Sequence, residues 1–240
     1  MKRSAIIITG GGQRLGFELA KALHSEDTPV IISYRTSRAE LKQLTALGIT
    51  CIQADFSSDK GIEGFSDYVL QNCSSLKAII HNASSWLAES DDLSPADTMQ
   101  PMLQVHVQAP YQLNIALQHL LIAYNQEAEQ AADIIHLTDY VVDKGSKKHI
   151  AYAASKAALA NLTLSFSALL APKVKVNSIA PALLMFNDDD GDEYKQKALK
   201  KSLMQLCPGA IEGVEAVKYL LNSSYITGHT LHLDGGRHLK

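Results

Sequence analysis

Tyr152 and Lys156 stand four residues apart in the segment Tyr-Ala-Ala-Ser-Lys. On a helix this spacing places both side chains on one face, where they can cooperate. A phenol ordinarily has a pKa of about 10, and a neighbouring ammonium favours the phenolate, which brings that pKa toward neutrality. The pair is therefore a candidate for general acid–base catalysis. On an arbitrary helix, a surface Tyr/Lys pair would be the better interpretation, so the assignment depends on the rest of the chain.

A glycine-rich turn near the start of the chain supports the catalytic interpretation. The apolar segment Ala5–Thr9 runs directly into Gly10-Gly11-Gly12-Gln13-Arg14-Leu15-Gly16, after which a helical period begins at Phe17. Glycines let the backbone turn tightly, approach a pyrophosphate and pack a helix closely on a strand. This context favours a dinucleotide site over an ordinary strand-to-helix connection, with candidate contacts at Gly10, Gln13, Arg14, Leu15 and Gly16.

The end of the second apolar segment indicates which dinucleotide would bind. An acidic residue there selects NAD, whereas a cation accepts the 2′-phosphate of NADP. The chain has Ser33-Tyr34-Arg35-Thr36-Ser37 and no acid. Arg35 can make a forked contact with a phosphate, and Ser33, Thr36 and Ser37 are further donors. These residues, with Tyr34, predict NADPH, although Arg35 could also be an ordinary solvated arginine.

Two later segments could contact the same ligand. Asp55 and Phe56 come just after the third apolar segment, where an adenine edge could be recognised, and Asn82-Ala83-Ser84 follows the fourth. Small residues at a strand end would let the dinucleotide pass close to the backbone. Asp and Asn also form ordinary turns, and that alternative stays open.

Positioning these groups requires a sheet with helices on both sides. Short apolar runs typical of buried parallel strands occur at Ala5–Thr9, Val30–Tyr34, Cys51–Ala54, Ala78–His81, Ile134–Leu137, Lys175–Ile179 and Thr230–Leu233. Helical patterns lie between them at Phe17–His24, Arg38–Leu47, Gly61–Gln71, Ala96–Tyr124, Tyr152–Leu170, Tyr194–Gln205 and Val214–Asn222. The alternation predicts an α/β fold in one domain over residues 1–240: a Rossmann-like, doubly wound parallel sheet with helices on both faces.

Composition excludes several other classes. Lys plus Arg total 22 and Asp plus Glu total 25, a net charge of −3 without a basic block, so no nucleic-acid partner is expected. No apolar stretch approaches the length of about 20 residues that a membrane span needs, and the start of the chain lacks a secretory segment. We therefore expect a cytoplasmic protein with no membrane partner. The three cysteines and nine histidines lack ligand spacing, so reduced thiols and no metal are expected.

Together these motifs resemble the short-chain dehydrogenase/reductase family over essentially the whole chain. The resemblance includes Tyr152-x-x-x-Lys156, Asn177-Ser-Ile-Ala-Pro181 and Thr227-Gly228 followed by Asp234-Gly-Gly. It implies that Lys156 also binds the nicotinamide ribose and that Tyr152 and Pro181 contact the cofactor. It further implies a homotetramer packed through the long helices. At position 14, most members of the family have a small residue. Arg14 at this position resembles the pattern of the pteridine reductases within the family.

Further departures from the usual pattern also point to a pterin. Asp139 occupies the usual place of a serine, and pteridine reductases pair such an aspartate with the tyrosine to protonate a ring nitrogen; its alternative is a turn cap. Trp86 resembles the aromatic that stacks on the pterin, although a core or interface tryptophan is as consistent with the sequence. Ser84 could bind pterin amino or carbonyl groups, and Arg14 could bridge cofactor and pterin. His106 stands where many members of the family have an asparagine that positions a relay water. We favour the interpretation that His106 is a helix histidine with satisfied hydrogen bonds; a modified relay is the alternative.

The resemblance implies an NADPH-dependent reductase of dihydropterins, with dihydrofolate reduction as a side activity. Catalysis is assigned to Tyr152, Lys156 and Asp139, and substrate binding to Arg14, Ser84, Trp86, Asp139 and Tyr152. Five of the seven residues from Asn187 to Glu193 are acidic, and residues 183–206 are expected to form a lid over the site. A reductase of ordinary ketones and a non-catalytic NADPH sensor remain alternatives.

Overall fold

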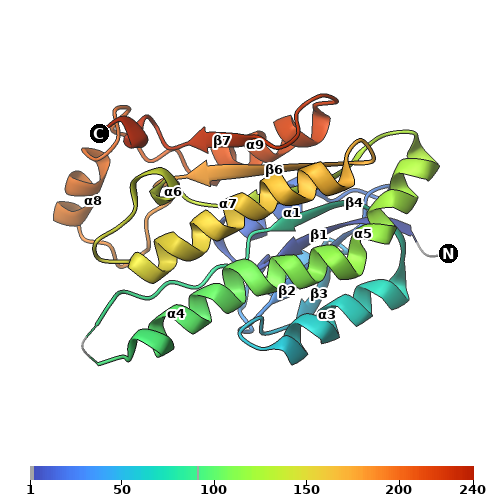
Figure 1. The fold of residues 1–240 in the computed structure, drawn as a ribbon, viewed down its shortest axis with the longest axis horizontal. Helices are drawn as coiled ribbons and strands as arrows, with labels where there is room; N and C mark the ends of the chain where they lie inside the picture. Colours follow the sequence, from blue (N-terminus) through green and yellow to red (C-terminus); the bar gives the residue numbers. More distant parts are fainter. Residues whose placement is uncertain (1–2, 91) are drawn as a thin grey trace.

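The computed structural model describes residues 3–90 and 92–240 and contains a seven-stranded parallel sheet (Figure 1). The strand order is β3-β2-β1-β4-β5-β6-β7, so the direction of winding reverses between β1 and β4. This confirms the predicted doubly wound fold. A ligand crevice is expected at such a reversal, beside the carboxyl ends of the strands. The strands are β1 (Arg3–Thr9), β2 (Val30–Tyr34), β3 (Thr50–Gln53), β4 (Cys73–His81), β5 (Ala132–Leu137), β6 (Val174–Pro181) and β7 (Thr230–Leu233).

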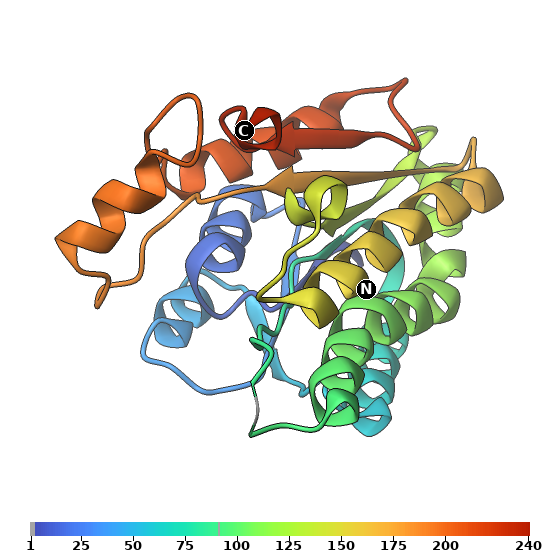
Figure 2. The same cartoon turned by 60° about the vertical axis from the view of Figure 1, so that its left-hand side comes forward.

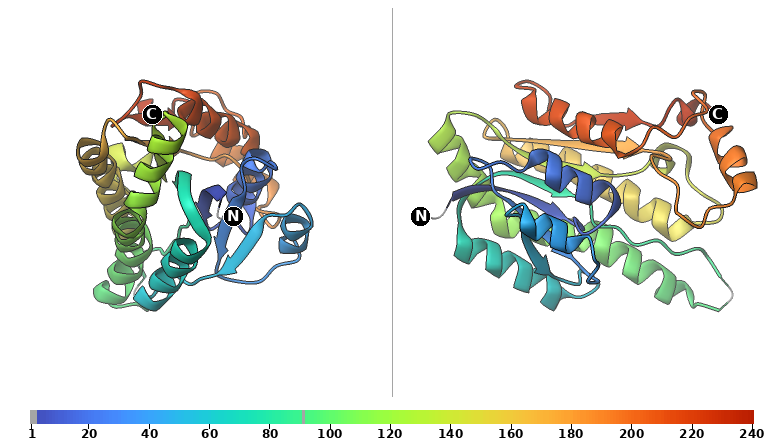
Figure 3. Two further views of the ribbon diagram at one scale, coloured as in Figure 1. Left: turned by 90° about the vertical axis from the view of Figure 1, so that its right-hand side faces the viewer. Right: turned by 180° about the vertical axis from the view of Figure 1, so that it is seen from behind.

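Alternating strand residues face two helical layers. Ile7 packs into a core with α3, α5 and α7, whereas Ile6 and Ile8 pack into a core with α1, α2 and α9. Figure 1 shows the first layer in front of the sheet, and the view from behind in Figure 3 shows the second. The helices are α1 (Arg14–Leu23), α2 (Leu41–Ala46), α3 (Asp59–Asn72), α5 (Ala109–Ala128), α7 (Ile150–Leu170) and α9 (Ala210–Asn222).

The predicted helix Ala96–Tyr124 is not one uniform helix. It consists of α4 (Pro95–Leu103), a π-helical turn η1 (Gln104–Gln108) and α5. Pro110, near the start of α5, has no N–H, and a proline ring conflicts with the carbonyl four residues earlier, here that of His106. A wider turn accommodates this conflict. The turn places His106 against the start of α7.

The predicted helix Tyr194–Gln205 is also shorter than expected. The observed helix α8 (Asp192–Leu199) ends earlier because the N–H groups of Leu203 and Met204 both bind the carbonyl of Gly235. The chain after α8 is thus held against the turn that follows β7. The helix predicted for Arg38–Leu47 is shortened to α2, and a short helix α6 (Val141–Lys144) was not predicted.

One expectation about apolar stretches needs correction. By length and composition, α7 could cross a membrane, with a mean hydropathy of 1.2 over its most apolar window. The same helix packs against β5 and β6 and carries the buried Lys156. Its apolar character therefore matches that of a core helix between a sheet and an outer surface.

Candidate active site

The glycine-rich turn joins β1 to the start of α1. Gly10 has a φ of +65°, and a Cβ there would stand 2.8 Å from the Cα of Ala83. The amide of Asn82 fixes the turn by donating to the carbonyls of Thr9 (3.1 Å) and Gly10 (2.9 Å). No side chain caps α1, so its first N–H groups remain available to an anion. The turn can therefore cradle a phosphate, as the sequence predicts.

A cleft of about 560 Å³ extends from this turn across the carboxyl ends of β1, β2, β4 and β6. The carboxyl ends of these strands lie on the side of the sheet that Figure 2 brings forward. Apart from Ser37, Tyr152 and Lys156, the residues predicted to contact the cofactor line the cleft: Gly10, Gln13, Arg14, Leu15, Gly16, Ser33, Tyr34, Arg35, Thr36, Asp55, Phe56, Asn82, Ala83, Ser84 and Pro181.

Two arginines line the cleft after β2. Arg35 was predicted, but Arg38 was assigned only to a helix start. The carbonyl of Arg35 accepts a 3.1 Å hydrogen bond from Gln53, which holds this segment against β3. Ser33 also lines the cleft; it is buried, and its hydroxyl oxygen accepts the Gly10 N–H at 3.0 Å, which links the glycine-rich turn to β2. Residues 35–38, which follow β2, contain a second arginine and no acidic residue. This second arginine is the signal that could have identified Arg38.

Arg14 connects the glycine-rich turn to the predicted lid. Its guanidinium donates to the side chain of Asn187 and, at 3.0 Å, to the carbonyl of Met185. Its φ of 53° lies in the left-handed region, which is uncommon for a residue with a side chain. The structure therefore ties Arg14 to residues 185–187 while leaving it on the wall of the cleft.

Asp139, Tyr152 and Lys156 meet beside the cleft, where β5 ends and α7 begins. The Tyr152 hydroxyl donates to the Asp139 carboxylate at 2.9 Å. The other carboxylate oxygen of Asp139 accepts the N–H of Val141 at 3.0 Å, so Asp139 also serves as the turn cap considered above. Lys156 is buried and donates to the carbonyl of Leu137 at 2.7 Å. The fold thus joins the carboxyl and phenol groups across 13 residues of sequence.

The environment changes the expected ionisation of these groups. Burial raises the pKa of Tyr152 well above its ordinary value, and the neighbouring Asp139 raises it further. The ammonium therefore does not stabilise a phenolate here, contrary to our expectation. Burial also raises the pKa of Asp139 despite Lys156, and burial lowers the pKa of Lys156 to about 8. The site favours protonated oxygens.

His106 is fully buried between Ser84 and α7. One ring nitrogen lies 2.8 Å from the Ser84 hydroxyl and the other lies 2.8 Å from the Ser155 hydroxyl. Its ring meets that of Tyr152 edge to face at 5.4 Å. Each ring nitrogen of His106 has a partner, as the favoured interpretation of a satisfied helix histidine expects. Its neighbours Ser84 and Tyr152 are also candidate site residues.

Trp86 forms an exposed aromatic wall on the cleft. Its side chain is 62% exposed, so it is not a core residue. Its ring centroid lies 4.4 Å from that of His149, with the two rings tilted at 41°; the sequence analysis did not single out His149. A planar ligand could lie on such a surface.

A phosphate-binding turn at the reversal of a parallel sheet, beside a buried tyrosine–lysine pair, defines a dinucleotide-dependent oxidoreductase. The chain belongs to the short chain dehydrogenase family, whose sequence profile matches residues 4–189.

The relatives of the chain are reductases or share its fold. It is 53% identical over 235 residues to dihydromonapterin reductase of Escherichia coli K12, covering 98% of this chain and 97% of that protein. It matches the NADP complex of FolM alternative dihydrofolate reductase 1 from Brucella canis with a TM-score of 0.86 and 25% identity, covering 99% of this chain and 94% of the other. The RhlG/NADP complex of Pseudomonas aeruginosa, 23% identical with a TM-score of 0.86 and coverages of 99% and 97%, shares the fold.

Proposed function

We propose that this enzyme uses NADPH to reduce a dihydropterin, with 7,8-dihydromonapterin as the substrate and tetrahydromonapterin as the product. Identity of 53% over nearly the full length of a dihydromonapterin reductase supports this substrate. Dihydrofolate is proposed as a secondary substrate, which is supported by the similarity to FolM alternative dihydrofolate reductase 1. The observation that carries the proposal is the hydrogen bond between Asp139 and Tyr152.

The cleft suits NADPH. The first turn of α1 and the glycines before it would hold the pyrophosphate, and Arg35 and Arg38 would hold the 2′-phosphate. Lys156 would bind the nicotinamide ribose once its bond to Leu137 is exchanged. When bound, this cofactor supplies the hydride for reduction of a C=N bond.

Asp139 and Tyr152 would handle the proton that this reduction also requires. Saturating a C=N bond requires a proton at the ring nitrogen, so a proton-rich pair is more useful there than a phenolate. Burial raises the pKa of both groups, which favours their protonated forms. Tyr152 would donate its proton and recover one from Asp139 across their 2.9 Å hydrogen bond.

The substrate would lie between this pair and the aromatic wall. Trp86 would stack on the bicyclic ring, with a contribution of about 0.5–1.5 kcal/mol beyond the burial of apolar area. Ser84 and Arg14 would contact its polar groups. Residues 183–206 would form a lid that excludes water, and the contacts from Arg14 to Met185 and Asn187 would couple that lid to the cofactor turn.

Oxidation of NADPH in the presence of dihydromonapterin, dihydrofolate, dihydrobiopterin and a panel of ketones tests this proposal. We expect turnover with the dihydropterins, most efficiently with dihydromonapterin. Turnover of ketones alone would replace the proposal with an ordinary carbonyl reductase. Binding of NADPH without any turnover would favour the sensor.

We also propose that the enzyme is a cytoplasmic homotetramer formed through α5 and α7. Both helices carry exposed apolar side chains, including Tyr111 (50%) and Ile115 (41%) on α5 and Leu164 (53%) and Leu169 (62%) on α7. Burial of such side chains against another copy is favourable because it removes apolar area from water.

A further inference from the structure

The contacts of His106 determine which of its ring nitrogens carries the proton. Nδ1 lies 2.8 Å from the Ser155 hydroxyl oxygen, whose own hydrogen is donated to the carbonyl of Tyr152 at 2.8 Å. The Ser155 oxygen must therefore accept from Nδ1. On the other side, Nε2 receives the backbone N–H of Ser85 at 3.2 Å, and an N–H can only donate. Both sides require hydrogen on Nδ1 and a lone pair on Nε2.

The opposite tautomer would direct the hydrogen on Nε2 toward the N–H of Ser85. It would also require Ser155 to give up its bond to Tyr152. Burial, with the charge of Lys156, lowers the pKa of His106 to about 2, so the ring is neutral and one tautomer must be chosen. With hydrogen on Nδ1, the ring donates to Ser155, and the one lone pair of Nε2 is shared by the Ser84 hydroxyl and the N–H of Ser85.

This tautomer fixes the direction of the Ser84 hydroxyl. Ser84 lies 2.8 Å from Nε2 and must donate to it, because Nε2 has no hydrogen to give. The other acceptor within reach of the Ser84 hydroxyl is more distant, the backbone carbonyl oxygen of Ser85 at 3.4 Å. Ser84 is exposed on the wall of the cleft. Its oxygen therefore faces the cleft with lone pairs and no hydrogen.

We infer that His106 is a positioning residue that makes Ser84 an obligatory hydrogen-bond acceptor, so that the site selects ligands presenting an N–H group at this position. The inference rests on the proposed function for its ligand, and it assigns Ser84 to the exocyclic amino group of the pterin. The two open possibilities for Ser84, amino or carbonyl recognition, are thereby reduced to one. A site that accepts from an amino group disfavours a ligand lacking that group, because the Ser84 oxygen then loses a hydrogen bond in the occupied cleft.

The test compares kcat/KM for a dihydropterin and for an analogue in which hydrogen replaces the exocyclic amino group. The wild-type enzyme should prefer the amino compound by about tenfold, the effect of one hydrogen bond. In His106→Leu, Ser84 is free to rotate and that preference should fall toward one. His106→Gln places a side-chain oxygen near the position of Nε2, held there by the N–H of Ser85, and should keep most of the preference.

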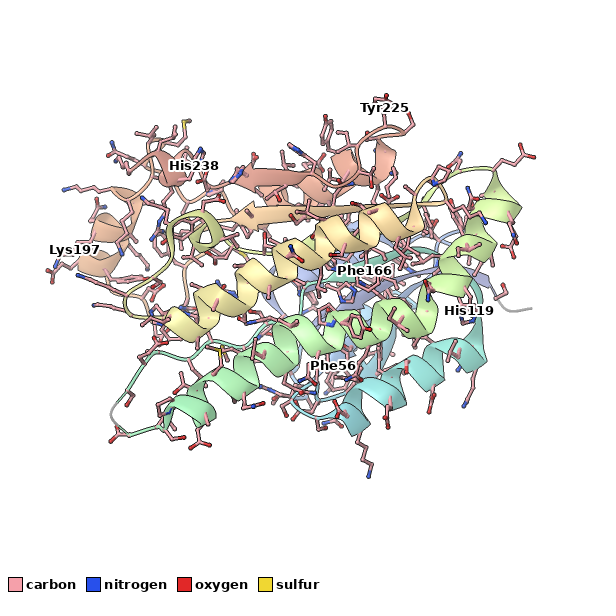
Figure 4. The ribbon with its side chains drawn as sticks, viewed as in Figure 1. Phe56, His119, Phe166, Lys197, Tyr225 and His238 are labelled. Atoms are coloured by element: carbon pink, nitrogen blue, oxygen red, sulfur yellow. The ribbon has the colours of Figure 1, made fainter. Side chains whose placement is uncertain are left out.

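His106→Asn separates positioning from structural support, because its shorter amide can reach Ser155 but not Ser84. It should lose the preference as His106→Leu does. Changing Ser84 to Ala should abolish the preference and make a further His106→Leu substitution without effect on it. His119→Asn and His119→Gln are matched controls, since His119 is exposed on α5 away from the start of α7 (Figure 4). NADPH affinity and thermal midpoints identify any variant that fails to fold.

Nitrogen-15 NMR of the histidine rings tests the tautomer in the wild-type enzyme without any substitution. We expect His106 to be neutral with hydrogen on Nδ1 across the neutral pH range. Hydrogen on Nε2, or an unchanged amino preference in His106→Leu, would overturn the inference. Failure of the wild-type enzyme to reduce any dihydropterin would refute the proposed function instead, and the tautomer would still decide the role of His106.

Discussion

Tyr152 illustrates how burial and a neighbour change a residue whose type alone suggests a different role. Next to Lys156 on one helix face it predicts a phenolate, but Asp139 lies closer to its oxygen and burial disfavours charge. The same side chain therefore stays protonated at neutral pH, as a proton donor must be. The residue that distinguishes these roles is Asp139, where an ordinary member of the family has a serine.

Removing the Tyr152 hydroxyl should affect chemistry more than binding. Tyr152→Phe keeps the ring beside His106 but removes the proton donor, so kcat with a dihydropterin should fall by about 10²–10⁴-fold. NADPH affinity, measured by fluorescence titration, should change by less than about threefold. Tyr111→Phe, on the exposed face of α5, is the control. An unimpaired Tyr152→Phe enzyme would show that the proton comes from another group.

The pH dependence of kcat should report the proton supply. The pKa of Asp139 is raised, and only its protonated form can replenish Tyr152, so kcat should decline as pH rises through that pKa. Asp139→Asn should lower kcat and remove this decline. A second decline near pH 8, where Lys156 loses its charge, should remain in both enzymes. Pre-steady-state rates across the pH range measure both effects, and an identical profile for Asp139→Asn would exclude the relay.

At the scale of elements, the site depends on close contact between the turn after β1 and the end of β4. A Cβ at Gly16 would stand 2.5 Å from the carbonyl oxygen of Gly10 and 2.6 Å from the side-chain nitrogen of Asn82. The start of α1 therefore cannot accept even a methyl group without displacing the phosphate turn. This contact explains Gly16, the last glycine of the turn, more fully than its spacing does.

Gly16→Ala should destabilise the protein by about 1–3 kcal/mol through overpacking and weaken NADPH binding. Gly64→Ala is the matched control, because nothing lies within 4 Å of its Cβ position on α3. That substitution should stabilise the protein by about 0.4–1 kcal/mol through helix propensity. Thermal and denaturant unfolding measure both changes. Equal stabilities for the two variants would contradict the close contact.

The loop after β2 should determine cofactor preference. The double variant Arg35→Ala/Arg38→Ala should bind NADPH about 10–100-fold more weakly, since charge-assisted hydrogen bonds contribute about 1.5–3 kcal/mol. NADH has no 2′-phosphate, so its affinity should change little. Lys42→Ala, exposed on α2 and outside the cleft lining, is the control. Tighter binding of NADH than NADPH by the wild-type enzyme would contradict this assignment.

At the scale of the whole molecule, the exposed apolar side chains of α5 and α7 predict assembly. Light scattering coupled to gel filtration should report a tetramer. Leu164→Glu combined with Tyr111→Glu should dissociate it, because each change would bury a charge in the proposed interface. Leu47→Glu is the control at a site that is 52% exposed near α2. A monomeric wild-type enzyme would refute the proposed interface.

The sequence by itself determined the doubly wound fold, the glycine-rich turn and the position of the tyrosine–lysine pair. These follow from local features: the period of apolar residues, the conformational freedom of glycine and the i, i+4 spacing on a helix. Most residues that line the cleft could also be named, because strand ends and the loops after them meet at one edge of a parallel sheet.

The tertiary structure decided what depends on distance across the sequence. The Ser33 hydroxyl accepts the N–H of Gly10, and Arg14 donates to Met185 and Asn187. The π-helical turn that presents His106 interrupts a predicted helix. The tertiary structure also decided the competition between burial and Lys156 at Asp139. Desolvation and hydrogen-bond direction are set by which groups become neighbours in three dimensions, and neither is encoded in a local pattern.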